Sequence, residues 1–191
     1  MLKKCIALAT VAAFATPTFA ADSPFYVGGQ VGATKSKISA GNFSEDFDFT
    51  TLSVLAGYNF TDNFALEARL GTGIKSEKYR DGNYTDEYSV RHKQLLLLRG
   101  NVPISDAFSL YGLAGLGAVK LKYEEQYTLS TDSGTIKADG FSWGVGAQLN
   151  INNNWAANVE YVQLPEKTLR DDLGSYKLKT NSVSLGIVYQ F

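Results

Sequence analysis

The chain has 191 residues, of which 18 are basic and 19 acidic, with a formal net charge of −1 and a hydrophobic content of 45%. This length has room for one domain, and the charge balance gives no support for a nucleic-acid partner. The single cysteine, Cys5, and the single histidine, His92, argue against both a disulfide framework and a transition-metal site.

The first 20 residues have the features of a secretion signal. Lys3 and Lys4 provide a positive start, residues 6–14 form a short apolar segment, and Pro17-Thr18-Phe19-Ala20 is suitable for cleavage. The apolar segment is shorter than the roughly 20 residues that a spanning helix needs. We therefore expect residues 1–20 to be a signal peptide, cleaved after Ala20 or Ala21, and residues 21–191 to be one mature domain without cysteine.

The remaining sequence consists of segments in which apolar and polar residues alternate, as is typical of β-strands. The predicted strand cores are 25–36, 49–60, 64–75, 88–102, 108–123, 138–151, 155–164 and 178–191. Short polar turns are predicted at 61–63, 103–107 and 152–154, and long polar loops at 36–48, 76–87, 124–137 and 165–177. Long loops that alternate with short turns predict an even-stranded meander with both termini on the turn side, which is typical of transmembrane barrels.

Each predicted strand has one apolar face and one face of small or polar residues. Val54, Leu66, Leu96 and Leu116 lie on the apolar face, whereas ten of the 18 glycines fall on the other face. Glycine normally weakens a strand, so this clustering requires a steric cause, and the narrow lumen of an eight-stranded barrel provides one. The alternative is a soluble barrel or sandwich whose apolar face is turned inward.

Aromatic residues favour the membrane barrel over the soluble alternative. They fall at the turn-side strand ends (Phe60, Phe64, Phe108, Trp155, Tyr189 and Phe191) and towards the loop side (Phe49, Tyr88, Tyr123, Tyr127 and Tyr176). Two aromatic bands around aliphatic middles are typical of the two membrane interfaces. The sequence therefore predicts an all-β fold, an eight-stranded antiparallel up-and-down transmembrane β-barrel.

The last strand alternates regularly from Ser182 to Phe191, with Val188 as the one apolar residue on the small face. A barrel's last strand must pair with its first, because an open sheet edge is not tolerated in lipid. An amphipathic strand that ends on an aromatic residue resembles the assembly signal of bacterial outer-membrane barrels. We therefore expect Tyr189 and Phe191 to contact the barrel-assembly machinery.

Charged residues on the small face predict a polar network in the lumen. Isolated charges would be costly there, so they should pair. We place the centre of the network at Glu67 and Arg99, and either a plug or a gated ion path could result. Eight strands leave no wide channel, which favours the plug. The predicted lumen residues are Glu67, Arg69, Arg99, Gln148, Asn158 and Glu160.

Several motifs resemble the small outer-membrane barrels of the OmpA, OmpX and Opa type, a porin-like family, over nearly the whole mature chain. They are Tyr58-Asn59-Phe60, Phe64-Ala65-Leu66-Glu67, Asn158-Val159-Glu160-Tyr161 and the closing residues 184–191. In this resemblance Glu67 matches a lumen glutamate and Arg99 a lumen lysine, whereas Gln148 and Asn158 replace charged residues. The resemblance implies the outer membrane of a Gram-negative cell, with extracellular loops and periplasmic termini.

No catalytic, cofactor-binding or metal site is predicted. Nucleophilic and acid–base mechanisms ordinarily need a histidine held against a nucleophile and a carboxylate. His92 instead falls on the outward face of the fourth strand and is followed by Lys93 and Gln94. A lipid A-modifying enzyme, as some eight-stranded barrels are, is the least favoured function.

The exposed loops remain as the place where function should lie. Five loop residues are predicted to make contacts because tyrosine and arginine are favoured at interfaces: Tyr79, Arg80, Tyr84, Tyr123 and Tyr127. The OmpX-like resemblance implies a role in envelope integrity, adhesion or host-factor binding. Outer-membrane lipids and lipopolysaccharide phosphates are expected partners, and a narrow passive pore for ions or small solutes is the alternative function.

Overall fold

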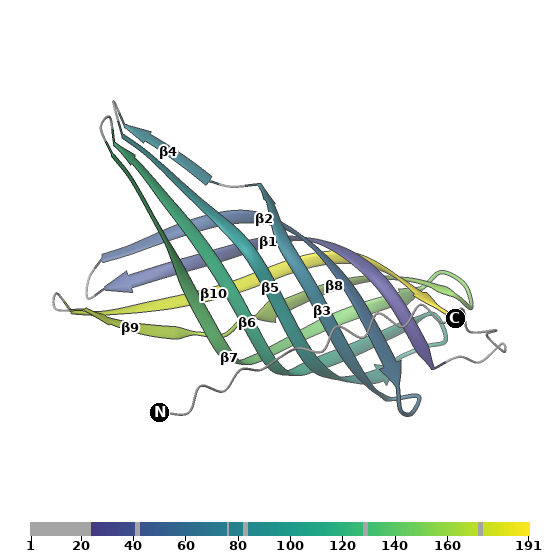
Figure 1. Cartoon of the computed structure of the whole chain (residues 1–191). Helices are drawn as coiled ribbons and strands as arrows, with labels where there is room; N and C mark the ends of the chain where they lie inside the picture. Colours follow the sequence, from purple (N-terminus) through teal and green to yellow (C-terminus); the bar gives the residue numbers. More distant parts are fainter. Residues whose placement is uncertain (1–23, 41–42, 76, 82–83, 128–129, 172–173) are drawn as a thin grey trace.

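The computed structural model describes residues 24–40, 43–75, 77–81, 84–127, 130–171 and 174–191, and its strands form one antiparallel sheet (Figure 1). Eight strands pair in the order β1-β2-β3-β5-β6-β7-β8-β10, and β10 pairs back with β1, so the barrel is closed. Two short strands, β4 and β9, extend the wall at one end. The bounds are β1 Phe25–Ala40, β2 Phe43–Asn59, β3 Phe64–Lys75, β4 Glu77–Asp81, β5 Tyr84–Pro103, β6 Phe108–Tyr127, β7 Ser130–Asn150, β8 Trp155–Gln163, β9 Lys167–Asp171 and β10 Gly174–Gln190.

The hydrogen-bonded register staggers the strands around the barrel. The cross-strand partners that start at Gln148 of β7 are, in order, Asn158, Gly186, Gln30, Ser53, Gly71, Lys93, Val119 and finally Ala138, again in β7. One circuit therefore moves ten residues along β7, from 148 to 138. Such a stagger requires tilted strands and fixes the width of the lumen. It also brings residues that are distant in sequence, such as Gln30 and Lys93, onto one continuous inner row.

The fold class predicted from the sequence is confirmed, and the eight strand cores and the three short turns lie where they were expected. The four long loops were predicted too long, because most of 36–48, 76–87, 124–137 and 165–177 is strand. In the first hairpin, Lys35 and Lys37 pair in register with Asp48 and Asp46, with ion pairs of 3.5 and 3.9 Å. These stretches are polar on their outer face, so they lack the hydropathy contrast that marks a strand in lipid.

The polarity of the barrel wall is inverted relative to a water-soluble protein. Val54, Leu116 and Leu185 point outward and are 59, 65 and 61% exposed. Val188 points inward and is buried, as its position on the small face predicted. Within the described part of the chain, no helix is long and apolar enough to cross a membrane.

At the end opposite the C-terminus, the barrel wall divides into two groups of strands. Among the described residues, β2 pairs with β3 as far as Thr50 and Lys75, and β4 pairs with β5 alone. β8 ends at Gln163, and the pairing described for β9 is with β10. Figure 1 shows β4, β5, β6 and β7 projecting away from β1, β2, β9 and β10. We call this the loop end, and we call the end with the three short turns and the C-terminus the turn end.

Candidate functional site

The centre of the lumen is an ionic network around Arg69 of β3. Its guanidinium contacts Glu67 through Nε and Glu160 of β8 through both terminal nitrogens, with an Nη2 to Oε2 distance of 3.0 Å. Tyr26 donates a hydrogen bond to Glu67 at 2.8 Å, and Tyr111 donates one to Glu160 at 3.0 Å. All five side chains are buried. Charge-assisted bonds of this kind are the strong hydrogen bonds of proteins, and here they join opposite walls of the barrel.

Arg99 of β5 lies on the turn side of this centre. Its Nη1 is 3.7 Å from Glu67, whereas its Nη2 donates to Gln148 at 2.6 Å and its Nε to Asn101 at 2.9 Å. The guanidinium carbon also lies 3.8 Å from the centroid of the Tyr111 ring. The centre predicted at Glu67 and Arg99 is therefore displaced to Arg69, because Arg69 reaches both carboxylates whereas Arg99 lies near Glu67.

The structure brings the six residues of the predicted lumen network to the inner wall, but it connects Asn158 only indirectly. Gln30 donates to Asn158 at 3.4 Å and accepts from Arg69 at 3.5 Å. Tyr26, Tyr111 and Gln30 were absent from the predicted network. The sequence did indicate that both tyrosines point into the lumen. Each lies an even number of residues from inward-facing glycines of its own strand, so alternation places it on the inner face.

Paired glycines make room for the two tyrosine rings. Tyr26 pairs with Gly57 and Tyr111 with Gly146 across neighbouring strands. A Cβ atom added at either glycine would overlap the ring of the paired tyrosine. Each pair depends on the register of its hairpin, which the alternation of the sequence alone does not specify.

Towards the loop end, the lumen is filled by apolar side chains. This apolar plug consists of Phe47, Phe49, Leu95, Leu97, Tyr111, Leu113, Val119, Ala138, Val162, Leu164 and Leu178. Phe49 was predicted to belong to an aromatic band at the membrane interface, and that prediction is wrong. Its position alternates in phase with the inward residues Thr51 and Ser53, so its ring is buried in the lumen.

One wall of the lumen carries a row of hydroxyl groups. Thr34 contacts Thr51 at 3.2 Å and Ser182 at 3.0 Å, and Ser182 contacts Ser184 at 3.3 Å. These side chains are all buried and come from β1, β2 and β10. We call this the hydroxyl wall; it faces the leucine-rich wall that β5 and β6 contribute to the apolar plug.

At the turn end, the lumen widens into an open vestibule of about 1470 Å³. Amide side chains line much of it, including Asn59, Asn101, Gln148 and Gln190, and Arg99 lies at its inner limit. A solute that enters from this end therefore meets the ionic network first and the apolar plug behind it.

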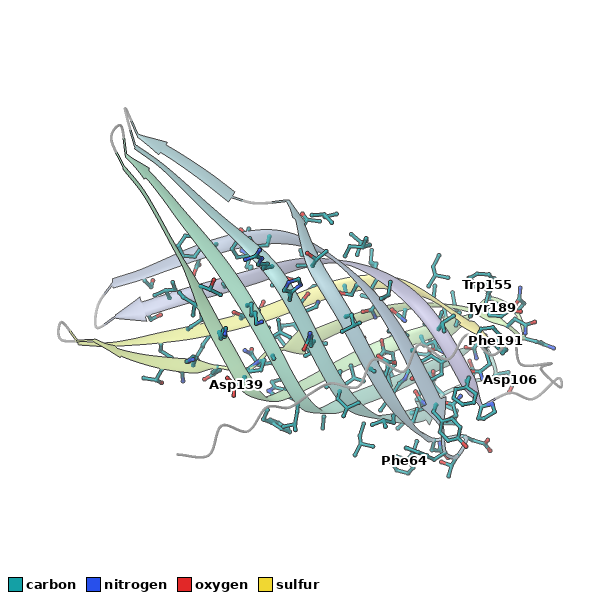
Figure 2. All side chains as sticks on the ribbon, viewed as in Figure 1. Phe64, Asp106, Asp139, Trp155, Tyr189 and Phe191 are labelled. Atoms are coloured by element: carbon teal, nitrogen blue, oxygen red, sulfur yellow. The ribbon has the colours of Figure 1, made fainter. Side chains whose placement is uncertain are left out.

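Aromatic side chains gather at the outer rim of the turn end. The ring centroids of Trp155 and Tyr189 are 4.9 Å apart, and those of Tyr189 and Phe191 are 5.1 Å apart. Figure 2 shows these three residues together at the chain end, where the last strand meets the wall. The two residues of the predicted assembly signal thus lie in one cluster with Trp155 of the adjoining strand β8.

The predicted surface residues differ in how far the structure describes them. Tyr79, Arg80, Tyr84, Tyr123 and Tyr127 belong to strands β4, β5 and β6, but their side chains lie outside what the structure describes. The predicted signal peptide, residues 1–20, also lies outside the described residues. His92 is exposed on the outer surface beside a β-bulge between Val90 and His92.

Comparison with known sequences gives one family match and two related proteins. Residues 6–191 match the model of the outer membrane protein beta-barrel domain family. The chain is 32% identical over 113 residues to virulence membrane protein PagC of Salmonella typhimurium, covering 57% of this chain and 56% of that protein. It is 29% identical over 139 residues to outer membrane protein P5 of Haemophilus influenzae, covering 68% of this chain and 38% of that protein. The matched part therefore spans about half, or less, of the length of these relatives.

Solved structures share the fold at low sequence identity. Ail, the attachment invasion locus protein of Yersinia pestis, superposes with a TM-score of 0.58 and 16% identity, over 89% of this chain and 99% of that one. Neisserial surface protein A gives a TM-score of 0.57 and 15% identity, over 88 and 98%. Ail in complex with the heparin analogue sucrose octasulfate gives 0.56 and 17%, over 87 and 99%. At these identities the likeness concerns the fold alone.

Proposed function

The chain belongs to the outer membrane protein beta-barrel domain family, and we propose that it is a plugged barrel that acts in envelope integrity and surface interaction, not in catalysis. Its location is the outer membrane of a Gram-negative cell. In the proposed orientation the loop end is extracellular and the termini are periplasmic. The single observation that carries the plug is the buried contact of Arg69 with both Glu67 and Glu160 across the lumen.

Two successive layers support a closed lumen. The ionic network occupies the middle of the barrel, and the apolar plug fills the space towards the loop end. Leu97 of the plug is fully buried. Eight strands leave an interior that side chains can fill, so no further closing segment is required.

The loop-end strands support the surface role. β5, β6 and β7 are 20, 20 and 21 residues long, whereas about 9 to 11 residues suffice to cross a bilayer. Strands of this length extend well beyond the membrane and present edges that another strand can join. Tyr79, Arg80, Tyr84, Tyr123 and Tyr127 are the proposed contact residues on these strands. Ail, which shares this fold, has been crystallised with a heparin analogue, which suggests sulfated polysaccharides as a ligand class to test here.

Basic residues next to the apolar surface support a contact with lipopolysaccharide phosphates. Lys120 and Lys137 are exposed on the outer wall and lie directly opposite each other, and His92 pairs with Lys120. Like charges directly opposite each other across two strands are destabilising, so an anionic partner would relieve them. The exposed Asp139 lies on the same strand as Lys137 and offsets part of this charge (Figure 2). Tyr189 and Phe191 are the proposed contacts with the barrel-assembly machinery.

Shortening the loop-end hairpins tests the surface role. Residues 124–127 pair in register with 130–133, and residues 78–81 with 84–87, so each hairpin can be trimmed by matched pairs without shifting the barrel. Cells that display the full protein should adhere to immobilised heparin, and each trimmed variant should adhere less. Faster gel migration of unboiled than of boiled protein verifies that the trimmed barrels are closed. Equal adhesion of cells with and without the full protein would refute this role.

The alternative function is a narrow pore, favoured by the open vestibule that reaches Arg99. Planar bilayers separate the two: a plug gives no stable openings, whereas a pore gives openings that change in the variants Glu67→Ala and Arg99→Ala. A lipid A-modifying activity would alter lipid mass on expression and would lose that effect in His92→Ala.

A further inference from the structure

The guanidinium of Arg99 lies at the inner limit of the vestibule, and two neutral groups hold one of its edges. Its Nε donates to Asn101 Oδ1 at 2.9 Å, and its Nη2 donates to Gln148 Oε1 at 2.6 Å. Nε and Nη2 form one edge of the planar guanidinium, and such an edge can hold both oxygens of one carboxylate. Here two amide oxygens from two different strands, β5 and β7, take the places of those two oxygens.

The carboxylate of Glu67 does not occupy this edge. It lies 3.7 Å from Nη1, the nitrogen that the amides do not engage, and the ring of Tyr111 covers one face of the guanidinium at 3.8 Å. Arg99 is only 4% exposed, whereas Asn101 and Gln148 are partly exposed and line the vestibule. An amide oxygen is a weaker partner for a buried cation than a carboxylate oxygen, because only the carboxylate gives a hydrogen bond in which both groups are charged.

Amide side chains line the vestibule on two opposite walls. On one wall, Gln148 donates to Asn150 Oδ1 at 3.0 Å, and Asn150 donates to the backbone carbonyl of Asp106 at 3.2 Å. On the other wall, Asn59 donates to Gln190 at 3.2 Å. The first wall is centred on β6 and the second on β1, and these two strands lie opposite each other in the closed order of the sheet. Each primary amide carries both donors and an acceptor, so the two walls match the hydrogen-bonding groups of a peptide.

We propose that the vestibule binds a short peptide by its free terminal carboxylate, whose two oxygens replace the amide oxygens of Asn101 and Gln148 on Arg99. The vestibule volume of about 1470 Å³ exceeds the roughly 300–1,000 Å³ of common ligand pockets, so it has room for several peptide residues. The acidic side chains of its lining, Asp62 and Asp106, are exposed to water in the turns at the rim, which screens their charge. The site goes beyond the proposed function and requires neither an open pore nor a surface partner.

Titration of the refolded barrel with a matched pair of ligands tests the site. N-acetyl-trialanine carries one terminal carboxylate, and its C-terminal amide is a neutral ligand of the same size. NMR of the barrel in detergent micelles follows the Nε–H signal of Arg99 as each ligand is added at equal ionic strength. The acid should shift this signal with saturation, and the amide should bind at least about tenfold more weakly because it lacks the charged hydrogen bonds. Equal binding of the two ligands, or no saturable shift with the acid, would overturn the proposal.

Two charge variants separate the vestibule from a general attraction of anions. Arg99→Gln should abolish the preference for the acid, which backbone amide shifts of the vestibule strands then measure. Glu67 keeps Arg69 as a partner in this variant, so the ionic network remains. Lys179→Met removes an exposed cation of the outer wall and should leave the preference unchanged. A preference for the acid that persists in Arg99→Gln would overturn the proposal.

Removal of the two competing amides gives a result that a merely solvated vestibule does not predict. The double variant Asn101→Ala, Gln148→Ala keeps Arg99 but takes away the acceptors that the carboxylate has to displace. The ratio of acid to amide affinity should therefore rise above that of the wild type, because contacts with the peptide groups cancel in this ratio. An unchanged or lower ratio would overturn the proposal, and this measurement decides if Arg99→Gln does not fold.

Discussion

The turn-side and loop-side halves of the lumen use the same alternation of the same strands but are filled by opposite chemistry. On the turn side, inward residues such as Glu67, Arg69 and Arg99 make an ionic network that opens into a polar vestibule. On the loop side, inward residues such as Phe49 and Leu97 make an apolar plug. The outer wall has to match lipid, whereas the inner wall only has to be filled and to satisfy its own polar groups. An ionic network and an apolar plug both meet that requirement.

The largest expected effect comes from breaking the turn-side half at Arg69. Arg69→Met leaves Glu67 and Glu160 buried without their shared partner, and removing one side of a buried pair costs about 3–5 kcal/mol. Urea unfolding of the refolded barrel measures this cost. The double variant Arg69→Met, Glu160→Gln keeps Glu67 beside Arg99 and leaves no carboxylate without a cation, so it should recover most of the loss. An Arg69→Met barrel as stable as the wild type would show that the network does not hold the two walls together.

A smaller effect is expected in the loop-side half, where two adjacent leucines face opposite ways. Leu97 is fully buried in the apolar plug, and Leu96 is 50% exposed on the outer wall. Leu97→Ala should cost about 2–5 kcal/mol, since it removes buried contacts and leaves a cavity. Leu96→Ala should cost clearly less because lipid or detergent refills the space. Equal losses in urea unfolding would contradict the assignment of the two faces.

Two glycine substitutions compare a position that is packed against an aromatic ring with a position that has free space around it. Gly57→Ala forces its new methyl group against the ring of Tyr26, which should cost about 1–3 kcal/mol. Gly112→Ala is the matched control, because nothing lies within 4 Å of a Cβ placed there. Both variants can be compared by urea unfolding in the same detergent. A cost at Gly112 as large as that at Gly57 would mean that contact with the tyrosine ring does not explain the cost at Gly57.

The smallest effect is expected outside both halves, at Glu166 beyond the end of β8. A hydrogen bond from Lys177 at 2.8 Å, aided by Lys179, lowers the pKa of the Glu166 carboxyl below its ordinary value. A carboxyl whose pKa is lower in the folded state stabilises the fold above its unfolded pKa and loses this contribution as pH falls through the folded pKa. Glu166→Gln should therefore slightly weaken the fold at pH 7 and make no difference at pH 2. The pair is solvent-exposed, so the change should be well under 1 kcal/mol, and an NMR titration of Glu166 checks the direction.

Much of the fold could be predicted from the sequence because lipid imposes a strict pattern. Every outward position of a spanning strand must be apolar, so Val54, Leu96 and Leu185 identified the outer face without any knowledge of register. The ends of the hairpins could not be predicted in the same way. Beyond the membrane both faces can be polar, and the cross-strand pairs of Lys35 and Lys37 with Asp48 and Asp46 become visible only when the strands are aligned.

The amino-acid sequence by itself determined the membrane-facing wall, the number of strands and the inward position of the six predicted lumen residues. Only the tertiary structure decided that Arg69 is the centre of the network and that Phe49 belongs to the plug. The reason is the stagger of ten residues around the barrel, which sets the residues that share a level of the lumen. Alternation specifies whether a side chain points into or out of the barrel, but closure of the sheet decides which other side chains it contacts in the lumen.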